Sequence, residues 1–477
     1  MTNVIRSCSP QRPDDVLTER AEVSADEVRA RVTRARAAQA GWHREGPAAR
    51  ASALRTAADR LRDRAPAIAD LLVREVGKPV REARAEVDRG AAILDYYAQM
   101  CFAATGDVLA PSLPASQPGL LYTERRPRGV AGLVTPWNFP LAIPLWKAAP
   151  ALAAGNAVLI KPSPEALACG EAVGHLFDGV LPEGLLGVVP GGAGTGRALV
   201  EASDVVSFTG SAAVGAQVAV LAAGAGTPVQ AEMGGHNAAV VLPDADVGHT
   251  AALLAAAAMG YAGQKCTATS RIIVVGDAAE FTEALVAAVA GLRFGDPAED
   301  EVTVGPVINA AARDRVRDVV ESARARGARV LTGDVRGHAD GDGFFVGPTL
   351  LDRVDPAHRV AREETFGPVA TVSSVPDLAT AVEVVNGVRY GLVTSVHGRD
   401  VEALLAVAGG IDTGLIRVNA PTTGVDHYAP FGGEKASSYG PREQGTAALD
   451  FYTSTRTVTF AAPARPAAPP RLVKESL

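Results

Sequence analysis

The spacing of apolar residues along the chain predicts an αβ protein. Residues 47–75 and 80–104 carry apolar residues at helical spacing with Arg, Asp and Glu on the opposite face, so the first hundred residues are predicted to be helical. After a Pro- and Ser-rich connection, short apolar runs alternate with helical stretches. The runs are 157–160, 187–189 and 204–208, and the helices that follow them lie near 165–177, 195–201 and 212–222. This alternation predicts a parallel sheet covered on both faces.

A second alternating region begins near residue 237 and runs to about residue 430, which predicts a second αβ unit. Residues 332–343 read as a polar surface loop. Residues 451–460 alternate like a strand and are rich in β-branched and aromatic side chains. This strand follows the second unit, so we expect it to pair elsewhere. The Pro- and Ala-rich segment 461–477 is expected to be a mobile tail.

Composition and charge narrow the possible functions. A chain of 477 residues is long enough for two or three domains. A net charge of −7 without a dense basic run argues against nucleic-acid binding. The four cysteines are scattered, so no disulfide framework and no metal site are expected, and a reducing cytoplasm is the expected location. We expect no secretory signal, because residues 1–6 begin no apolar core. We expect no membrane helix in the charge-free stretch 129–146, because prolines interrupt it.

Cys266 is the strongest candidate for a reactive group. Its neighbours Gln264, Lys265 and Thr267 are poor core material, which favours a nucleophile over an ordinary buried cysteine. Upstream, Glu232 precedes a Met-Gly-Gly turn, where a carboxylate could activate water for attack on an intermediate. Considered alone, Glu232 would be an ordinary carboxylate at the end of a strand.

Asn138 offers a side-chain amide that could complete a site containing Cys266 and Glu232. It lies between Trp137 and Phe139 in a loop bounded by two prolines. The amide could donate to a developing oxyanion together with the backbone N–H of Cys266. It could equally cap the helix that is predicted to begin near Leu141.

These segments, together with 363–368 (EETFGP) and 430–433 (PFGG) in this order, closely resemble the aldehyde dehydrogenase superfamily. The resemblance implies an α/β fold with two doubly wound αβ domains, a modified Rossmann cofactor domain and a catalytic domain, plus a small β oligomerisation element. The implied ranges are 1–108 and 129–234 for the dinucleotide-binding domain, 235–431 for the catalytic domain, and 109–128 and 445–460 for the oligomerisation strands. A homodimer or homotetramer is implied as well.

The resemblance also implies a mechanism. Cys266 would attack the aldehyde to give a thiohemiacetal, hydride would leave for a nicotinamide, and water activated by Glu232 would hydrolyse the resulting thioester. Glu443 matches a carboxylate that the family links to proton relay, and a structural ion pair is its equally weighted alternative.

The chain has no GxGxxG motif, and the resemblance implies another way of binding the dinucleotide. The implied residues are Thr135, Pro136, Trp137, Lys161, Ser163, Pro164, Phe208, Thr209, Gly210, Ser211, Gly215, Met233, Gly234, Glu364 and Phe366. NAD-preferring relatives often carry a carboxylate where this chain has Pro164, which favours acceptance of NADP. NAD stays open, because Glu165 is the next residue.

For the substrate, the stretches 417–428 and 437–443 resemble the 2-oxoglutarate-semialdehyde and succinate-semialdehyde dehydrogenase branch. The expected substrate is therefore a small anionic aldehyde with a carboxylate at its far end, and Arg417, Lys265 and His427 are the candidate cations. The other expected pocket residues are Phe139, Ile143, Trp146, Thr267 and Phe431. The alternatives are a general dehydrogenase, a phosphonate- or sulfonate-aldehyde dehydrogenase, a CoA-acylating dehydrogenase, and a non-catalytic structural homologue.

Overall fold

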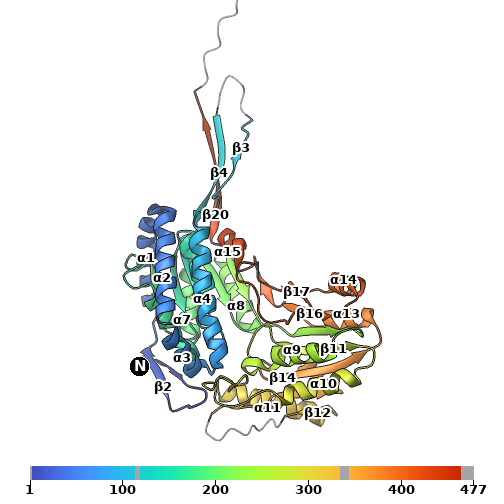
Figure 1. The fold of residues 1–477 in the computed structure, drawn as a ribbon. Helices are drawn as coiled ribbons and strands as arrows, with labels where there is room; N and C mark the ends of the chain where they lie inside the picture. Colours follow the sequence, from blue (N-terminus) through green and yellow to red (C-terminus); the bar gives the residue numbers. More distant parts are fainter. Residues whose placement is uncertain (1–2, 113–118, 334–342, 464–477) are drawn as a thin grey trace, which may run out of the picture.

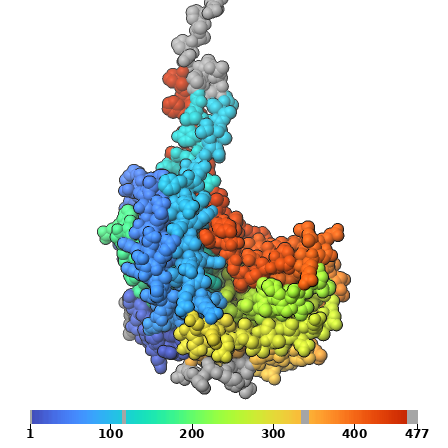
Figure 2. Space-filling model, viewed as in Figure 1, coloured from blue at the N-terminus to red at the C-terminus, as the bar shows by residue number. Residues whose placement is uncertain are grey.

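Two large β-sheets flanked by helices form the body of the molecule, and a thin three-stranded arm projects from it (Figures 1 and 2). The structure, a computed structural model, describes residues 3–112, 119–333 and 343–463. Most of the predicted loop at 332–343 and nearly all of the predicted tail at 461–477 lie outside these ranges. The predicted α/β fold with two αβ units is confirmed.

The first sheet has six strands in the order β19-β9-β8-β5-β6-β7. Their bounds are β5 (Val130–Val134), β6 (Ala157–Lys161), β7 (Leu186–Val188), β8 (Val205–Thr209), β9 (Val229–Glu232) and β19 (Ser438–Tyr439). β5 to β9 run parallel, and β19 is antiparallel to β9. The associated helices are η1 (Pro164–Ala166), α5 (Ala142–Ala153), α6 (Leu167–His175), α7 (Ala193–Ala202) and α8 (Ala212–Gly224). The predicted strands at 157–160, 187–189 and 204–208 correspond to β6, β7 and β8.

The first hundred residues are not all helical as predicted. β1 (Val4–Cys8) and β2 (Val16–Ala21) form an antiparallel hairpin before α1 (Ala25–Arg44). The predicted helix at 47–75 is two helices, α2 (Gly46–Asp63) and α3 (Ala65–Val76), because the backbone leaves the helical region at Arg64 (φ −103°, ψ 8°) and Pro66 is the second residue of α3. α4 (Val80–Met100) then packs against both α2 and α5.

The second sheet has seven strands in the order β12-β13-β14-β11-β10-β16-β17. Their bounds are β10 (Asn237–Val241), β11 (Thr269–Val275), β12 (Arg329–Thr332), β13 (Thr349–Asp352), β14 (Val369–Val375), β16 (Val393–His397) and β17 (Leu415–Val418). The helices of this unit are α9 (Val247–Met259), η2 (Gly260–Gly263), α10 (Ala279–Ala290), α11 (Ala310–Ala325), α12 (Arg359–Arg362), α13 (Leu378–Asn386) and α14 (Val401–Gly410). β12 is antiparallel to β13, while the other neighbours are parallel. A short pair, β15 (Tyr390–Gly391) with β18 (Glu434–Lys435), completes the unit.

The arm consists of β3 (Val108–Leu109), β4 (Gly119–Pro127) and β20 (Thr453–Ala461). β20 is antiparallel to β4 along its whole length, from Thr453 opposite Pro127 to Ala461 opposite Gly119. The first part of the segment expected to form this strand, 445–460, is instead a helix, α15 (Gly445–Phe451). The role of the arm in oligomerisation stays a prediction.

The chain returns to the first sheet after it has completed the second. β19 pairs with β9 so that Ser438 lies opposite Glu232. Residues beyond 431 therefore contribute to the first unit. The sequence-based prediction placed the end of that unit at residue 234. Within the described ranges, none of the helices combines the length and the apolar run that a membrane span requires.

Candidate active site

Cys266 lies just after a backbone turn that few residues adopt. Tyr261 (φ 54°) and Ala262 (φ 52°) have left-handed conformations, followed by Gly263 (φ 65°). Each such non-glycine residue costs about 1–2 kcal/mol, so the surroundings must hold the turn in place. The Gln264 side chain does so by donating to the carbonyl of Pro306 (3.1 Å) and accepting from the N–H of Ile308 (2.8 Å).

Cys266 borders two cavities. One, of about 300 Å³, is also lined by Phe139, Trp146 and Lys265. The other, of about 390 Å³, is also lined by Asn138 and Glu364. A group on this thiol could therefore be reached from both sides, as a reaction between two bound molecules requires.

The surroundings of Cys266 oppose a resting thiolate. Burial, followed by the negative charges of Glu364, Glu232 and Glu443, raises the pKa of the Cys266 thiol to about 12. The thiol is therefore protonated at neutral pH, and a base must take its proton when it attacks.

Asn138 is buried, and its side-chain amide donates to the carbonyl of Gln264 at 3.0 Å. This bond ties the Asn138 loop to the Cys266 loop. Asn138 does not cap α5. The carboxylate of Glu86 accepts instead from the backbone N–H groups of Leu141 (3.0 Å) and Ala142 (2.9 Å).

A buried ion pair connects the same two loops. Lys78 pairs with Glu86, and both side chains are essentially inaccessible to solvent. The Lys78 ammonium also lies 3.8 Å from the ring centre of Phe139 and 4.8 Å from that of Tyr261. It thus contacts the residue after Asn138 and a residue of the turn before Cys266, and holds the two loops together.

Glu232 ends β9 and is almost fully buried. Its Oε2 accepts from the Ser438 hydroxyl at 2.6 Å, and its Oε1 has no hydrogen-bond partner among the described residues. Burial, followed by the charge of Glu443, raises the pKa of Glu232 well above the usual range of a carboxyl group. Glu232 does not line either cavity that Cys266 borders, but its charge acts on the thiol.

Glu443 has the partners of a structural ion pair. It pairs with Lys147, and both side chains are buried. The Trp146 indole N–H donates to the same carboxylate at 2.8 Å, and the Ser207 hydroxyl donates at 3.2 Å. A role of Glu443 in proton relay stays a prediction.

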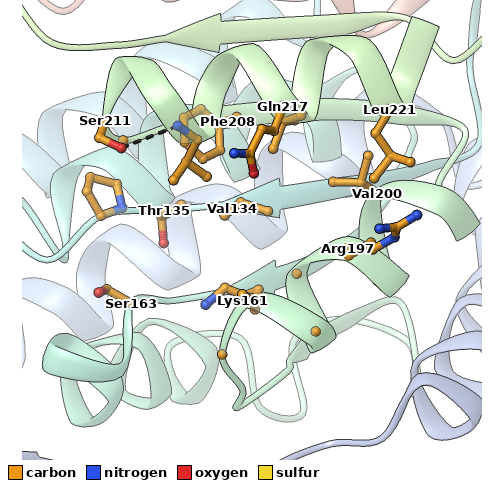
Figure 3. Close-up of a pocket in the computed structure, with 18 of the residues that line it drawn as sticks. Val134, Thr135, Lys161, Ser163, Arg197, Val200, Phe208, Ser211, Gln217 and Leu221 are labelled. Atoms are coloured by element: carbon orange, nitrogen blue, oxygen red, sulfur yellow. Dashed lines mark hydrogen bonds between the residues drawn. The ribbon is translucent and has the colours of Figure 1, made fainter. Parts of the chain in front are cut away.

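A larger cavity, of about 1130 Å³, begins beside Trp137 and extends over the first sheet (Figure 3). Ser211 caps α8 by accepting from the N–H of Val214 (3.4 Å), so the positive end of this helix faces the cavity. A Cβ atom at Gly210 would come within 2.6 Å of the Phe208 ring, so the turn needs glycine. A dinucleotide fits this combination of glycine turn, helix N-terminus and apolar wall.

Nearly all the residues predicted to bind the dinucleotide border this cavity or the adjoining one beside Cys266. Those of the larger cavity are Thr135, Pro136, Trp137, Lys161, Ser163, Pro164, Phe208, Gly210 and Ser211, while Thr209, Met233, Gly234, Glu364 and Phe366 border the adjoining one. Gly215 borders neither. A Cβ atom there would lie 2.5 Å from Met233, so Gly215 allows α8 to approach that side chain.

Charged residues in and around this cavity bear on the choice between NAD and NADP. Burial lowers the pKa of Lys161 to about 8, and its ammonium donates to the carbonyls of Pro162 and Gly191, both at 2.8 Å. Glu165 does not line the cavity, because its carboxylate accepts from Ser163 (2.5 Å) and Asn309 (3.4 Å). Arg197, which the sequence did not indicate, also lines the cavity, and its guanidinium pairs with Glu201 at 2.9 Å (Figure 3).

The smaller cavity of about 300 Å³ contains most of the predicted substrate residues. Phe139, Ile143, Trp146, Lys265, Thr267 and Phe431 all line it. Arg417 and His427 do not. Arg417 lies within the edge strand β17, opposite Ser395, and the His427 ring packs edge-on against Tyr96.

The cations of this cavity are Lys265 and Arg89. Lys265 pairs with Glu82 at 2.8 Å, whereas no hydrogen bond or ion pair joins Arg89 to another residue of the described chain. Sequence reasoning missed Arg89, because α4 shows a charged face of ordinary composition. The available signal was the spacing of Glu82, Glu86 and Arg89, which places all three on one stripe of the helix.

Comparison with known proteins gives a consistent family. A sequence profile of the aldehyde dehydrogenase family matches residues 2–458. The alpha-ketoglutaric semialdehyde dehydrogenase of Bacillus subtilis is 37% identical over 463 residues, covering 96% of this chain and 94% of that protein. The alpha-ketoglutarate semialdehyde dehydrogenase of Haloferax volcanii is 38% identical over 460 residues, covering 94% of each. The crystal structure of betaine aldehyde dehydrogenase from Staphylococcus aureus in complex with NAD⁺ has a TM-score of 0.92 at 28% identity, covering 96% of this chain and 91% of that one.

Proposed function

This chain belongs to the aldehyde dehydrogenase family, and we propose that it oxidises a small anionic aldehyde, whose far end is a carboxylate, to the corresponding acid. The observation that carries the proposal is Arg89, which borders the cavity beside Cys266 and has no hydrogen-bond or ion-pair partner among the described residues. The relatives from Bacillus subtilis and Haloferax volcanii support it, since the aldehyde in their names bears a carboxylate. 2-Oxoglutarate semialdehyde is therefore the first substrate to test.

The two cations of the cavity differ in what they can offer an anion. The charge of Lys265 is already offset by Glu82. The nearest charges that favour the cationic form of Arg89 are Glu86 and Asp426, and neither makes a direct ion pair with it. A substrate carboxylate would supply Arg89 with the missing partner, and a guanidinium can bind it through two parallel hydrogen bonds.

In the proposed mechanism the Cys266 sulfur attacks the aldehyde carbon. A C–S bond forms, the carbonyl π electrons move to oxygen, and the thiol proton passes to a base. The second N–H of the Asn138 amide and the backbone N–H of Cys266 would stabilise the oxyanion, because the first N–H of Asn138 already donates to Gln264. Loss of hydride from the same carbon leaves a thioester on Cys266.

Water then hydrolyses the thioester, with Glu232 as the base. Its Oε1 can accept a proton from water, because only Oε2 is engaged by Ser438. Attack by water breaks the C–S bond, releases the acid and returns Cys266 to its starting state. A base in this position favours hydrolysis over transfer to CoA.

The glycine turn at Gly210, the N-terminus of α8 and Lys161 would hold the dinucleotide, with Glu364 and Phe366 at the end nearest Cys266. When bound, its nicotinamide supplies the acceptor for the hydride. We propose that NADP is accepted as well as NAD. Pro164 contributes no carboxylate to the cavity, the Glu165 carboxylate is engaged by Ser163 and Asn309, and Arg197, which pairs with Glu201, brings a further guanidinium to the lining.

The test is the initial rate of reduced-nicotinamide formation from purified enzyme. NAD and NADP would each be combined with 2-oxoglutarate semialdehyde, succinic semialdehyde, a phosphonate-bearing aldehyde and a neutral aldehyde of similar length. We expect kcat/KM to be at least about tenfold higher for a carboxylate-bearing aldehyde than for the neutral one, since a charged hydrogen bond contributes about 1.5–3 kcal/mol. Equal rates for neutral and anionic aldehydes would reject the anionic substrate, and a preference for the phosphonate would reassign it.

The nucleophile has its own control. Cys266→Ala should abolish aldehyde oxidation while NAD binding, followed by quenching of intrinsic fluorescence, is retained. Residual oxidation by this variant would reject the covalent mechanism. Formation of an acyl-CoA product by the wild-type enzyme in the presence of CoA would reject the hydrolytic step alone.

A further inference from the structure

A second group of cationic side chains surrounds a cavity at the root of the arm. The cavity, of about 460 Å³, lies between the start of α2, the C-terminal ends of α4 and α5, and the strands β4 and β20. Arg89 borders the aldehyde cavity from one part of α4, and Met100 borders this one from its end. At about 1.5 Å of rise per residue these two positions are roughly 16 Å apart, so the cavities are distinct.

Four arginines and a single glutamate line the cavity: Arg50, Arg125, Arg126, Arg456 and Glu124. Glu124 pairs with Arg456 and lies 3.9 Å from Arg126. Arg125 pairs with Asp450, which lies just outside the lining. The carboxylates therefore offset part of the positive charge and leave an excess, to which Arg50 contributes most directly.

Arg50 is the least satisfied of these cations. Its side chain is buried, with the residue 9% exposed, and Nη1 donates to the carbonyl of His43 at 3.2 Å. The Arg50 Nε and the His43 Nδ1 are buried and have no partner among the described residues. A buried guanidinium without a counter-charge is costly, and an anion in the cavity would remove that cost.

The start of α2 adds to the positive potential. Gly46 and Pro47, the first two residues of this 18-residue helix, line the cavity. Glu45, at the N-cap position, makes no capping hydrogen bond with its side chain. The N–H groups of the first turn are thus not capped by that side chain, and a helix N-terminus carries a partial positive charge that favours anions.

From these observations we propose that the cavity at the root of the arm binds a phosphate group. The phosphate is either inorganic phosphate or part of a small organic phosphate, and the volume of the cavity is sufficient for both. Arginine suits phosphate because its planar guanidinium matches the oxygens of the anion. The site is independent of the dinucleotide and aldehyde sites, and the proposal does not depend on which aldehyde is oxidised.

The proposal is tested with the full-length enzyme saturated with NAD, so that phosphate cannot bind at the dinucleotide site. Thermal unfolding would be followed as inorganic phosphate, glycerol phosphate, succinate or chloride is added at matched ionic strength. We expect saturable stabilisation by a phosphate compound beyond that given by chloride and succinate. Tighter binding of glycerol phosphate than of inorganic phosphate would identify an organic phosphate as the ligand.

Three variants locate the site. Arg50→Met removes the buried cation. Arg126→Gln removes an exposed cation of the same cavity, and it keeps the test available if Arg50→Met fails to fold. Each should weaken phosphate binding by roughly ten- to a hundredfold, the equivalent of one charged hydrogen bond. Arg55→Gln, an exposed arginine of α2 outside the lining, is the matched control and should leave binding unchanged. Equal stabilisation by phosphate and chloride, or the same phosphate affinity in Arg126→Gln as in the wild type, would overturn the proposal.

Discussion

Replacement of Arg89 by methionine separates recognition of the substrate charge from the chemistry at Cys266. Methionine keeps an unbranched apolar stem in the cavity and removes the guanidinium. Arg89 makes no ion pair or hydrogen bond within the described chain, so the change breaks no internal bond of the folded enzyme. Its cost should therefore appear in substrate binding rather than in stability.

The magnitude follows from the position of Arg89. A half-buried cation about 4 Å from a carboxylate, at an effective dielectric constant near 20, interacts with it by about 4 kcal/mol. A charged hydrogen bond measured by mutation gives about 1.5–3 kcal/mol. A loss of about 2–4 kcal/mol corresponds to a decrease in kcat/KM of about 30-fold to several hundredfold. Lys265 compensates little, because Glu82 holds it.

The assay is kcat/KM for 2-oxoglutarate semialdehyde and for a neutral aldehyde of similar length. If the carboxylate is bound equally in the ground state and the transition state, the loss appears mainly as a higher KM for the anionic aldehyde. Arg81→Met, which changes an exposed arginine on the same helix, is the control and should behave as the wild type. An equal loss for both aldehydes, or no loss for either, would refute the assignment of Arg89.

Three further predictions concern the base, the ion pair and the cofactor. Burial raises the pKa of Glu232, so its ionised and active fraction grows as pH rises through that pKa. Glu232→Gln should keep a single-turnover burst, lower steady-state turnover by about 100-fold or more and lose this pH dependence. An unchanged pH–rate profile in the variant would contradict the role of Glu232 as the base. Lys78→Met should lower the free energy of unfolding in urea by about 3–5 kcal/mol by leaving Glu86 buried without its counter-charge, whereas a change below about 1 kcal/mol would show that the pair is dispensable. Arg197→Ala should raise the KM for NADP by about tenfold and leave the KM for NAD unchanged. Equal changes for both cofactors would show that Arg197 does not contact the 2′-phosphate of NADP.

The parts of the site that sequence reasoning found are those in continuous segments. Ser211 caps a helix immediately after β8, and Glu232 ends β9, so each position follows from a strand and the turn after it. The dinucleotide cavity is built from such turns. Reading the turns in order is therefore enough to place most of its lining.

The elements that sequence reasoning missed depend on contacts with other parts of the chain. The hairpin of β1 and β2 exists because the strands pair with each other, although neither is strongly apolar. The division of the helix at 47–75 is local, but the periodicity hides it, because the pattern of apolar residues continues across the break at Arg64. α15 takes the place of the start of the predicted strand, because this segment packs against α5.

The reaction and the substrate are therefore readable from the sequence to different degrees. The proposed reaction rests on Cys266, Glu232 and Asn138, each of which is surrounded by a short motif. The proposed recognition of substrate charge depends on where a long side chain projects from α4, and the packing of α4 against α5 brings Arg89 to the cavity that Cys266 borders. Arg417 was a candidate because it lies in the resembling stretch 417–428, yet its strand forms the edge of the other sheet. A mutational study of substrate choice should accordingly begin with α4 and not with the loop after β17.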